Sequence, residues 1–354
     1  MKYLQRTCAA LCVLALAAAP ASAAPAASAA TAAGSVTQDS FDRAAAYSES
    51  SNGISLLVML DGRVAFERYS ARTGPGFPME LASATKSFCG ILACIAVAEG
   101  LCTLDEKISG TITEWRSDPR KREITLRQLL TLSSGLKTGN ERGNVPTFAQ
   151  AIAAPMVYAP GERFSYGAVP FQVFGEFLKR KLGGRDPVAY LDEKVFQPIG
   201  LRYSRWTRGT DGNPHLSSGA ALTARNWAKF GELVRLGGTW QGRVLITERL
   251  LSACFEGTAA NPAYGLTWWL NRDTSEELRK SIPQLENGTD FMYDESYIPH
   301  DLVFAAGSGK QRLYLIPSLG MVIVRQGDRI RESLAGSYAS GFSDKEFFRI
   351  LFGG

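Results

Sequence analysis

Short apolar and β-branched runs lie near both ends of the chain and predict two β-hairpins. Residues 54–60 and 63–69 flank Asp61-Gly62, a dipeptide that favours the tight type I′ turn. Residues 311–316 and 321–326 are also rich in β-forming residues, and the turn-forming stretch 317–320 separates them. The pattern thus predicts strands in the N-terminal and C-terminal parts of the chain.

Apolar positions between the two hairpins recur at helical spacing. They predict helices over residues 84–99, 126–132, 170–181, 187–196 and 223–236. A short helix is expected over 40–50, and a last helix is expected from the N-cap Ser343, with Glu346 completing a capping box, to about Phe352. The expected fold class is α/β (α+β): an antiparallel sheet of N- and C-terminal strands flanked by the terminal helices, with a large central, mainly helical lobe. The active site is expected in the cleft between the lobes.

The first residues have the pattern of a secretory signal peptide. Lys2 and Arg6 precede an apolar stretch at 8–19, and small residues at 20–23 are typical of a cleavage site. The apolar stretch is shorter than the roughly 20 residues that a membrane-spanning helix needs. We therefore expect a signal peptide at 1–23, a disordered linker at 24–38 and one folded domain at 39–354. The mature protein is expected in the periplasm or outside the cell, without a membrane span.

Composition and charge exclude several classes of function. The chain has 354 residues, of which 45% are hydrophobic and 21% are charged, as in an ordinary globular protein. Its formal net charge of +5 comes without an arginine-rich stripe interleaved with aromatic residues, so no nucleic-acid partner is expected. The cysteines beyond the signal peptide, Cys89, Cys94, Cys102 and Cys254, form no Cys-x-x-Cys pair, and their disulfide state stays open. We expect no metal and no cofactor.

The familiar motifs of nucleophilic and nucleotide-binding sites are missing. The sequence has no Gly-x-Ser-x-Gly and no His-Glu-x-x-His. Its nearest likeness to a phosphate loop, residues 307–310, is followed by Gln311 where Ser or Thr is required. The two histidines, His215 and His300, lie in polar or proline-bearing stretches and are expected at the surface, so a Ser-His-Asp triad is not predicted.

Ser83 and Lys86 form a Ser-x-x-Lys pattern at the start of an apolar, helix-forming segment. Three residues make nearly one helical turn, so the hydroxyl and the ammonium are expected on one helix face, near the positive end of the helix dipole. Taken alone, the pattern also fits a helix cap followed by a solvated lysine. The rest of the chain must decide between these interpretations.

Three segments favour the catalytic interpretation. The first joins Ser83 and Lys86 to the turn at 99–108, the second spans 124–136, and the third spans 160–166. Together they resemble the serine β-lactamase, penicillin-binding protein and esterase superfamily over residues 53–350, and in particular its class C β-lactamase-like and esterase-like members.

This resemblance implies a role for five residues. Ser83 would be the nucleophile, and Lys86 with Tyr166 would form the base, although which of the two accepts the proton stays open. The backbone amides of Ser83 and Ser308 would form the oxyanion hole, and Gly307 would let the substrate pack against a strand.

Two positions depart from the family pattern. Ala168 stands where relatives carry an amide side chain after the tyrosine, and Ala305 stands where they carry a cation on the strand beside the nucleophile. We therefore expect an exported serine hydrolase that acts through an acyl-enzyme on small ester, amide or peptide-like molecules. The alternatives are a class C-like β-lactamase or D-alanyl-D-alanine carboxypeptidase and, in a different class, a non-catalytic penicillin-binding-like recognition protein.

Overall fold

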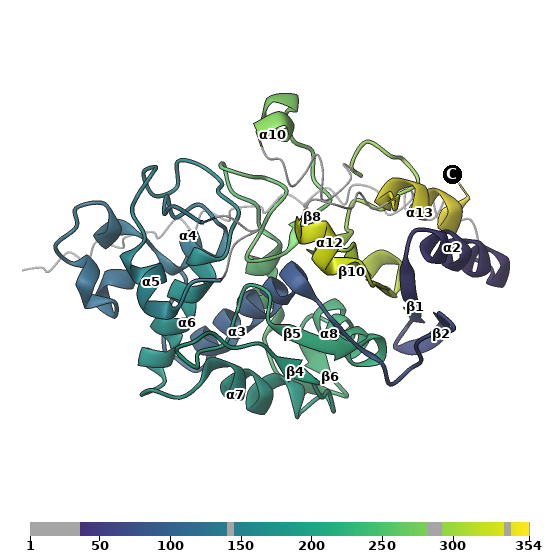
Figure 1. The fold of residues 1–354 in the computed structure, drawn as a ribbon, viewed down its shortest axis with the longest axis horizontal. Helices are drawn as coiled ribbons and strands as arrows, with labels where there is room; N and C mark the ends of the chain where they lie inside the picture. The colour runs from purple at the N-terminus through teal and green to yellow at the C-terminus, as the bar shows by residue number, and fades with distance from the viewer. Residues whose placement is uncertain (1–35, 140–144, 282–291, 336–340, 354) are drawn as a thin grey trace, which may run out of the picture.

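A six-stranded antiparallel sheet joins strands from the N-terminal and C-terminal parts of the chain (Figure 1). The strand order is β2-β1-β11-β10-β9-β8, so the first strands of the chain pair with the last. The computed structural model describes residues 36–139, 145–281, 292–335 and 341–353. The predicted signal peptide, and the predicted linker as far as residue 35, lie outside this part of the chain.

Both predicted hairpins are confirmed as antiparallel pairs. The strands of the sheet are β1 (Gly53–Leu60), β2 (Arg63–Tyr69), β8 (Trp269–Leu270), β9 (Val303–Gly307), β10 (Gln311–Ile316) and β11 (Met321–Gly327). Between β1 and β2, Asp61 and Gly62 have φ values of 46° and 80°. Positive φ at both central residues is what a type I′ turn requires.

Helices cover both faces of the sheet. α2 (Gln38–Ser50) and α13 (Asp344–Phe352) pack together on one face, and α8 (Ala224–Arg235) packs on the other. A Cβ on Gly231 of α8 would lie 2.7 to 3.0 Å from the side chains of Leu313, Leu315 and Val322, so glycine allows the helix to approach the strands closely. Because both faces are covered, every residue of β10 and β11 is buried. The predicted fold class is confirmed.

The last helix begins where predicted, but its capping box is incomplete. Ser343 is the N-cap, and its Oγ accepts a hydrogen bond from the Glu346 amide at 3.2 Å. The reciprocal bond is replaced, since the Ser343 amide donates to the Tyr47 hydroxyl at 2.8 Å. The Glu346 carboxylate instead pairs with Arg349 at 2.7 Å. A tertiary hydrogen bond to α2 thus replaces one of the two hydrogen bonds of the expected capping box.

The Ser-x-x-Lys segment precedes the predicted helix as a separate turn. Residues Ala82–Lys86 form a 3-10 helix, η1, and α3 (Ser87–Ala98) follows it. α3 is apolar on all sides and buried over most of its length, as a central core helix should be. The helical lobe further contains α4 (Leu126–Leu130), α5 (Phe148–Ala153), α6 (Val169–Lys181) and α7 (Pro187–Leu191), with the π-helical turn η5 (Asp192–Phe196) after α7 (Figure 1).

Short elements complete the described parts of the chain. Strands β3 (Pro78–Glu80), β5 (Ala220–Thr223) and β4 (Arg205–Trp206) form a three-stranded sheet, and β6 (Thr239–Trp240) pairs with β7 (Arg243–Val244). The remaining short helices are α9 (Glu248–Ser252), α10 (Glu276–Ser281), α12 (Ile330–Ala335) and the 3-10 turns η2 (Ile108–Gly110), η3 (Thr113–Trp115), η4 (Lys121–Glu123), η6 (Ala253–Phe255) and η7 (Pro317–Leu319). Within the described ranges, every helix is too short or too polar to cross a bilayer.

Candidate active site

The turn that contains Ser83 holds its side chain beside Lys86. In a 3-10 helix, residues three apart are eclipsed, so η1 aligns these two side chains more closely than an α-helix would. The Lys86 Nζ donates to the Ser83 Oγ at 2.9 Å. Ala82, directly before Ser83, has a φ of 47°, an unfavourable region for alanine that is often found next to functional groups. The half-buried Ser83 thus sits on a sharp, constrained turn.

Lys86 is buried, and its described contacts are with groups that have no formal charge. Its side chain is 3% exposed, and its Nζ also donates to the backbone carbonyl of Ser217 at 3.3 Å. The same Nζ lies 4.5 Å from the centre of the Tyr166 ring and 5.5 Å from the centre of the Phe171 ring. The structure therefore brings Ser83, Lys86 and Tyr166 into one cluster. It adds Ser217, which a sequence pattern could not reveal because it contributes a main-chain atom.

The other two segments that carried the resemblance hold Tyr166 in place. In the segment 124–136, the Leu132 carbonyl accepts a hydrogen bond from the Ser165 amide at 2.8 Å, and the Ser133 carbonyl accepts one from the Gly161 amide at 2.7 Å. Gly135 has a φ of 77°, and a Cβ there would lie 2.4 Å from the Tyr158 carbonyl oxygen. The segment 124–136 therefore supports the loop that leads to Tyr166.

Aromatic side chains pack around Tyr166. The Trp269 ring, from β8, lies 5.9 Å from it in a stacked arrangement, and the Tyr264 ring lies 6.4 Å from it edge-on. Tyr264 is 1% exposed and Trp269 is 3% exposed, so both are part of the core as well as neighbours of the site. Trp269 was not predicted near the site, because the two-residue strand β8 leaves almost no periodic signal.

Gly307 lies in backbone contact with the Ser83 turn. A Cβ on Gly307 would be only 2.1 Å from the Leu81 carbonyl oxygen and 3.0 Å from the Ala84 amide nitrogen. Any larger residue would push β9 away from η1. The half-buried Ser308 follows immediately, in the turn between β9 and β10. The strand end predicted to complete the oxyanion hole therefore lies against the turn that contains Ser83.

The two alanines that depart from the family pattern differ in accessibility. Ala168 is half-buried and forms the N-cap of α6, whereas Ala305 is 2% exposed and pairs with Leu313 in the sheet. The next cation along this hairpin is Lys310, whose Nζ lies 3.5 Å from the Asp344 Oδ2. Its ammonium is thus engaged by a buried carboxylate of α13.

The histidines and cysteines lie outside this cluster. His215 is half-buried, with its Nε2 buried, and burial lowers its pKa, so the expected surface position is wrong for this histidine. His300 is exposed and stacks on Tyr293 with ring centres 4.5 Å apart. The four cysteines within the described ranges are buried free thiols, with the sulfurs of Cys94 and Cys254 3.7 Å apart. In the part of the chain that is described, no group of three or more His, Cys, Asp or Glu residues could hold a metal ion.

Known proteins show the same architecture. The structure of EstCE1, a hydrolase with promiscuous acyltransferase activity, matches with a TM-score of 0.65 and 15% identity over 89% of this chain and 99% of that chain. A penicillin-binding protein homologue from Caulobacter crescentus matches with a TM-score of 0.63 and 18% identity, over 86% of this chain and 98% of the other. At such low identities these likenesses establish the fold alone.

Sequence comparison identifies the family. The monacolin J acid methylbutanoyltransferase of Aspergillus terreus (strain NIH 2624 / FGSC A1156) is 29% identical over 153 residues, which cover 35% of this chain and 37% of that protein. The matches to curated relatives cover 36 to 38% of the length of those proteins. A family model described as Beta-lactamase matches residues 39–326, well over half of the chain. The chain therefore belongs to the β-lactamase family of serine hydrolases.

Proposed function

We propose that this chain is a serine hydrolase that forms an acyl-enzyme on Ser83. The observation that carries the proposal is the 2.9 Å contact between the Ser83 Oγ and the Lys86 Nζ, with the Tyr166 ring against the same ammonium. A serine hydroxyl must lose its proton as it attacks a carbonyl carbon, and a base within hydrogen-bond reach makes this possible. Lys86 and Tyr166 together supply that base.

The proposed reaction has two steps. The Ser83 Oγ attacks the substrate carbonyl carbon, and its proton passes to the pair Lys86 and Tyr166, which enters the step with either a neutral Lys86 amine or a Tyr166 phenolate. The backbone amides of Ser83 and Ser308 donate hydrogen bonds to the developing oxyanion. The pair then gives the proton to the leaving alcohol or amine, which leaves an ester on Ser83. Water attacks this ester, the acid is released, and the Ser83 hydroxyl is restored.

Small esters and ordinary amides are the proposed substrates. The side chains of Ala168 and Ala305 can neither hydrogen-bond to a lactam amide nor attract a substrate carboxylate, and Lys310 is engaged by Asp344. Each lost polar contact costs about 1.4 kcal/mol, so kcat/KM for a cephalosporin should be about 100-fold lower than in a site with both contacts, and a short-chain p-nitrophenyl ester should be the better substrate. A cephalosporin value equal to the ester value would favour the alternative of a class C-like β-lactamase or D-alanyl-D-alanine carboxypeptidase.

Acyl transfer to an alcohol is a second candidate activity. It is favoured by the acyltransferase activities of two similar proteins, the methylbutanoyltransferase and EstCE1. An alcohol oxygen would attack the Ser83 ester in place of water, so that a new ester forms and the serine is released. The ratio of new ester to free acid, measured in the presence of a simple alcohol, separates the two activities.

Intact-mass labelling tests the proposed function. The mature protein is treated separately with a fluorophosphonate, an activated ester and a penicillin, and peptide mapping locates any adduct. Fluorophosphonate and ester adducts on Ser83 are expected. A penicillin adduct that forms faster would favour the lactam-directed alternatives, and no adduct with any reagent would favour a non-catalytic recognition protein.

We also propose that the protein is exported and matures by cleavage after residue 23. The support is the charged, apolar and small-residue pattern of the first residues. N-terminal sequencing of protein recovered from the periplasm and the medium should begin at Ala24. Protein recovered from the cytoplasm with Met1 or Lys2 at its N-terminus would contradict export.

A further inference from the structure

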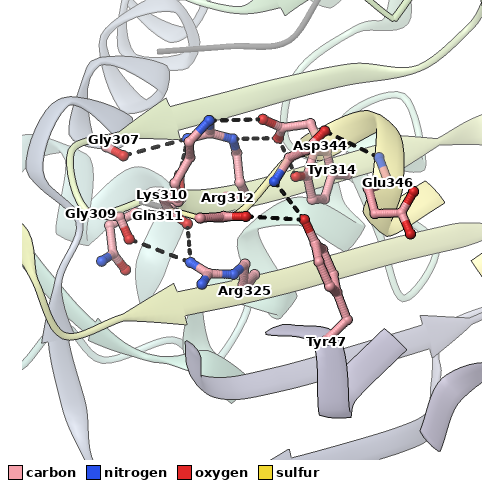
Figure 2. A network of polar contacts seen from close by, with 12 residues as sticks. Tyr47, Gly307, Gly309, Lys310, Gln311, Arg312, Tyr314, Arg325, Asp344 and Glu346 are labelled. Carbon is pink, nitrogen blue, oxygen red and sulfur yellow. Dashed lines mark hydrogen bonds and ion pairs between the residues drawn. The ribbon is translucent and has the colours of Figure 1, made fainter. Parts of the chain in front are cut away.

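One side of the β9–β10 hairpin holds buried charges that the proposed reaction does not use (Figure 2). Arg312 of β10 is 1% exposed, and Asp344, the first residue of α13, is fully buried. Their contact is bidentate, with 2.7 Å from Nε to Oδ1 and 3.1 Å from Nη2 to Oδ2. The Tyr314 hydroxyl also donates to Asp344, and the Lys310 ammonium lies 3.5 Å from it.

This cluster is fixed in its charged form. Burial would raise the pKa of the Asp344 carboxyl, but the positive charges of Arg312 and Lys310 outweigh burial and hold that pKa well below its ordinary value. Burial and the neighbouring carboxylate raise the pKa of Tyr314, which therefore remains a hydrogen-bond donor. Buried ion pairs contribute little net stability compared with apolar residues of similar size. A role in orienting the neighbouring backbone is a reason for a buried ion pair at this position.

The guanidinium of Arg312 also reaches the carbonyl groups at the base of the hairpin turn. Its Nη1 donates to the Gln311 carbonyl at 3.1 Å and to the Gly307 carbonyl at 3.4 Å. The Gly307 carbonyl and the Ser308 amide belong to one planar peptide group, and in a trans peptide they point in opposite directions. A carbonyl held toward Arg312 therefore turns the Ser308 N–H away from the buried charges.

We propose that Arg312, anchored by Asp344, is a positioning residue that sets the direction of the oxyanion-binding amide of Ser308. This inference rests on the proposed function, because it takes that amide as an oxyanion donor. Gly307 sets the distance between the hairpin and the Ser83 turn, and Arg312 sets the orientation of the peptide that follows. Hydrogen bonds weaken steeply as they bend, so a small rotation of this peptide costs much of the oxyanion stabilisation.

Arg325 of β11 provides a matched control. It is fully buried, and it also binds carbonyl groups of the turn, with Nη1 2.8 Å from the Lys310 oxygen and 3.4 Å from the Gly309 oxygen. Its Nη2 donates to the Ser51 carbonyl at 2.8 Å. Arg325 thus holds the far limb of the same turn, and its described contacts do not include the peptide between Gly307 and Ser308.

The test compares an ester with its thionoester. Sulfur accepts hydrogen bonds poorly, so the preference for p-nitrophenyl butyrate over its thiono analogue reports how well the oxyanion hole is aimed. Arg312→Met should lower kcat for the oxygen ester by about 10- to 100-fold with little change in KM, and should lower the preference by a similar factor. Arg312→Lys, which keeps a charge beside Asp344, should be intermediate. Arg325→Met should lower the unfolding temperature but keep the preference.

A double variant keeps the proposal testable if Arg312→Met does not fold. Arg312→Met combined with Asp344→Leu removes both charges, so it leaves no uncompensated carboxylate in the interior. A folded Arg312 variant with wild-type kcat, or with a lowered kcat but an unchanged oxygen preference, would overturn the positioning role. If Arg312→Met alone does not fold, the double variant and Arg312→Lys decide by the same criteria. Absence of any adduct on Ser83 in the wild type would instead overturn the proposed function itself.

Discussion

Lys86 of the Ser83 turn and Arg312 of the β9–β10 hairpin are both buried basic side chains, but their surroundings differ. The described contacts of Lys86 are with a hydroxyl, a backbone carbonyl and two aromatic rings. Arg312 faces a fully buried carboxylate in a bidentate ion pair. A lysine amine can exchange a proton, whereas an arginine guanidinium stays charged at any working pH. Lys86 is thus suited to chemistry and Arg312 to orientation.

The largest expected effect on activity comes from loss of the proposed nucleophile, the neighbour of Lys86. Ser83→Ala should abolish covalent labelling and lower ester turnover by on the order of 10³-fold or more, because the reacting groups act as one unit. Peptide mapping of a fluorophosphonate adduct is the measurement. Ser252→Ala, which removes an exposed serine of α9, is the control. Labelling that persists on another serine in Ser83→Ala would contradict the assignment.

Substitutions of the two proposed base residues separate the contribution of the Lys86 amine from that of the Tyr166 hydroxyl. Lys86→Ala and Tyr166→Phe should each lower kcat by about 10² to 10⁴-fold in a folded protein, the usual contribution of a positioned base. Tyr166→Phe keeps the ring beside the Lys86 ammonium and removes only the phenol oxygen. Steady-state kinetics with the ester as substrate measure kcat for both variants. A Tyr166→Phe value close to that of the wild type would assign the base to Lys86 alone.

Stability measurements examine the buried ion pair between Arg312 and Asp344. Asp344→Asn should lower the free energy of unfolding by about 3 kcal/mol at neutral pH, because Arg312 loses its buried counter-charge. The folded-state pKa of Asp344 is depressed below its ordinary value of 3.8, so its contribution is complete above about pH 4 and is lost as the pH falls below that value. Urea unfolding from pH 7 to pH 2 should show the two proteins converging in acid.

The control for this measurement is Glu346→Gln in the same first turn of α13. Glu346 pairs with Arg349 at the surface, and exposed pairs of this kind contribute little to stability. A gap between wild type and Asp344→Asn that stays constant down to pH 2 would show that the carboxylate is not the stabilising form.

The smallest expected effect concerns substrate preference. Ala168→Asn restores an amide at a half-buried position directly after the Tyr166 loop, where it could hydrogen-bond to a lactam amide. We expect a rise of about 10-fold in kcat/KM for a cephalosporin, equivalent to one hydrogen bond, with little change for the ester. Ala168→Leu has a similar volume without the amide and should not reproduce the gain. An equal gain from leucine would mean that shape, not hydrogen bonding, limits lactam turnover.

Local patterns predicted much of the fold because they depend on neighbouring residues. The Asp61-Gly62 turn, the β10–β11 hairpin and the Ser343 cap all follow from conformational preferences of a few adjacent residues. The spacing of Ser83 and Lys86 likewise placed both side chains on one helix face, and the tighter 3-10 geometry of η1 preserves that alignment. Helix ends were less accurate, since the predicted α3 segment divides into η1 and α3.

By itself, the sequence determined which residues we propose to react, because Ser83, Lys86 and Tyr166 lie in segments that resemble the motifs of one family. Only the tertiary structure decided what surrounds them. The Ser217 carbonyl lies 131 positions from Lys86, and Asp344 of α13 reaches Arg312 of β10. Arg312 lies on the face of the sheet that α13 covers, and α13 supplies its carboxylate partner. Such contacts depend on how distant elements pack, and no local pattern encodes them.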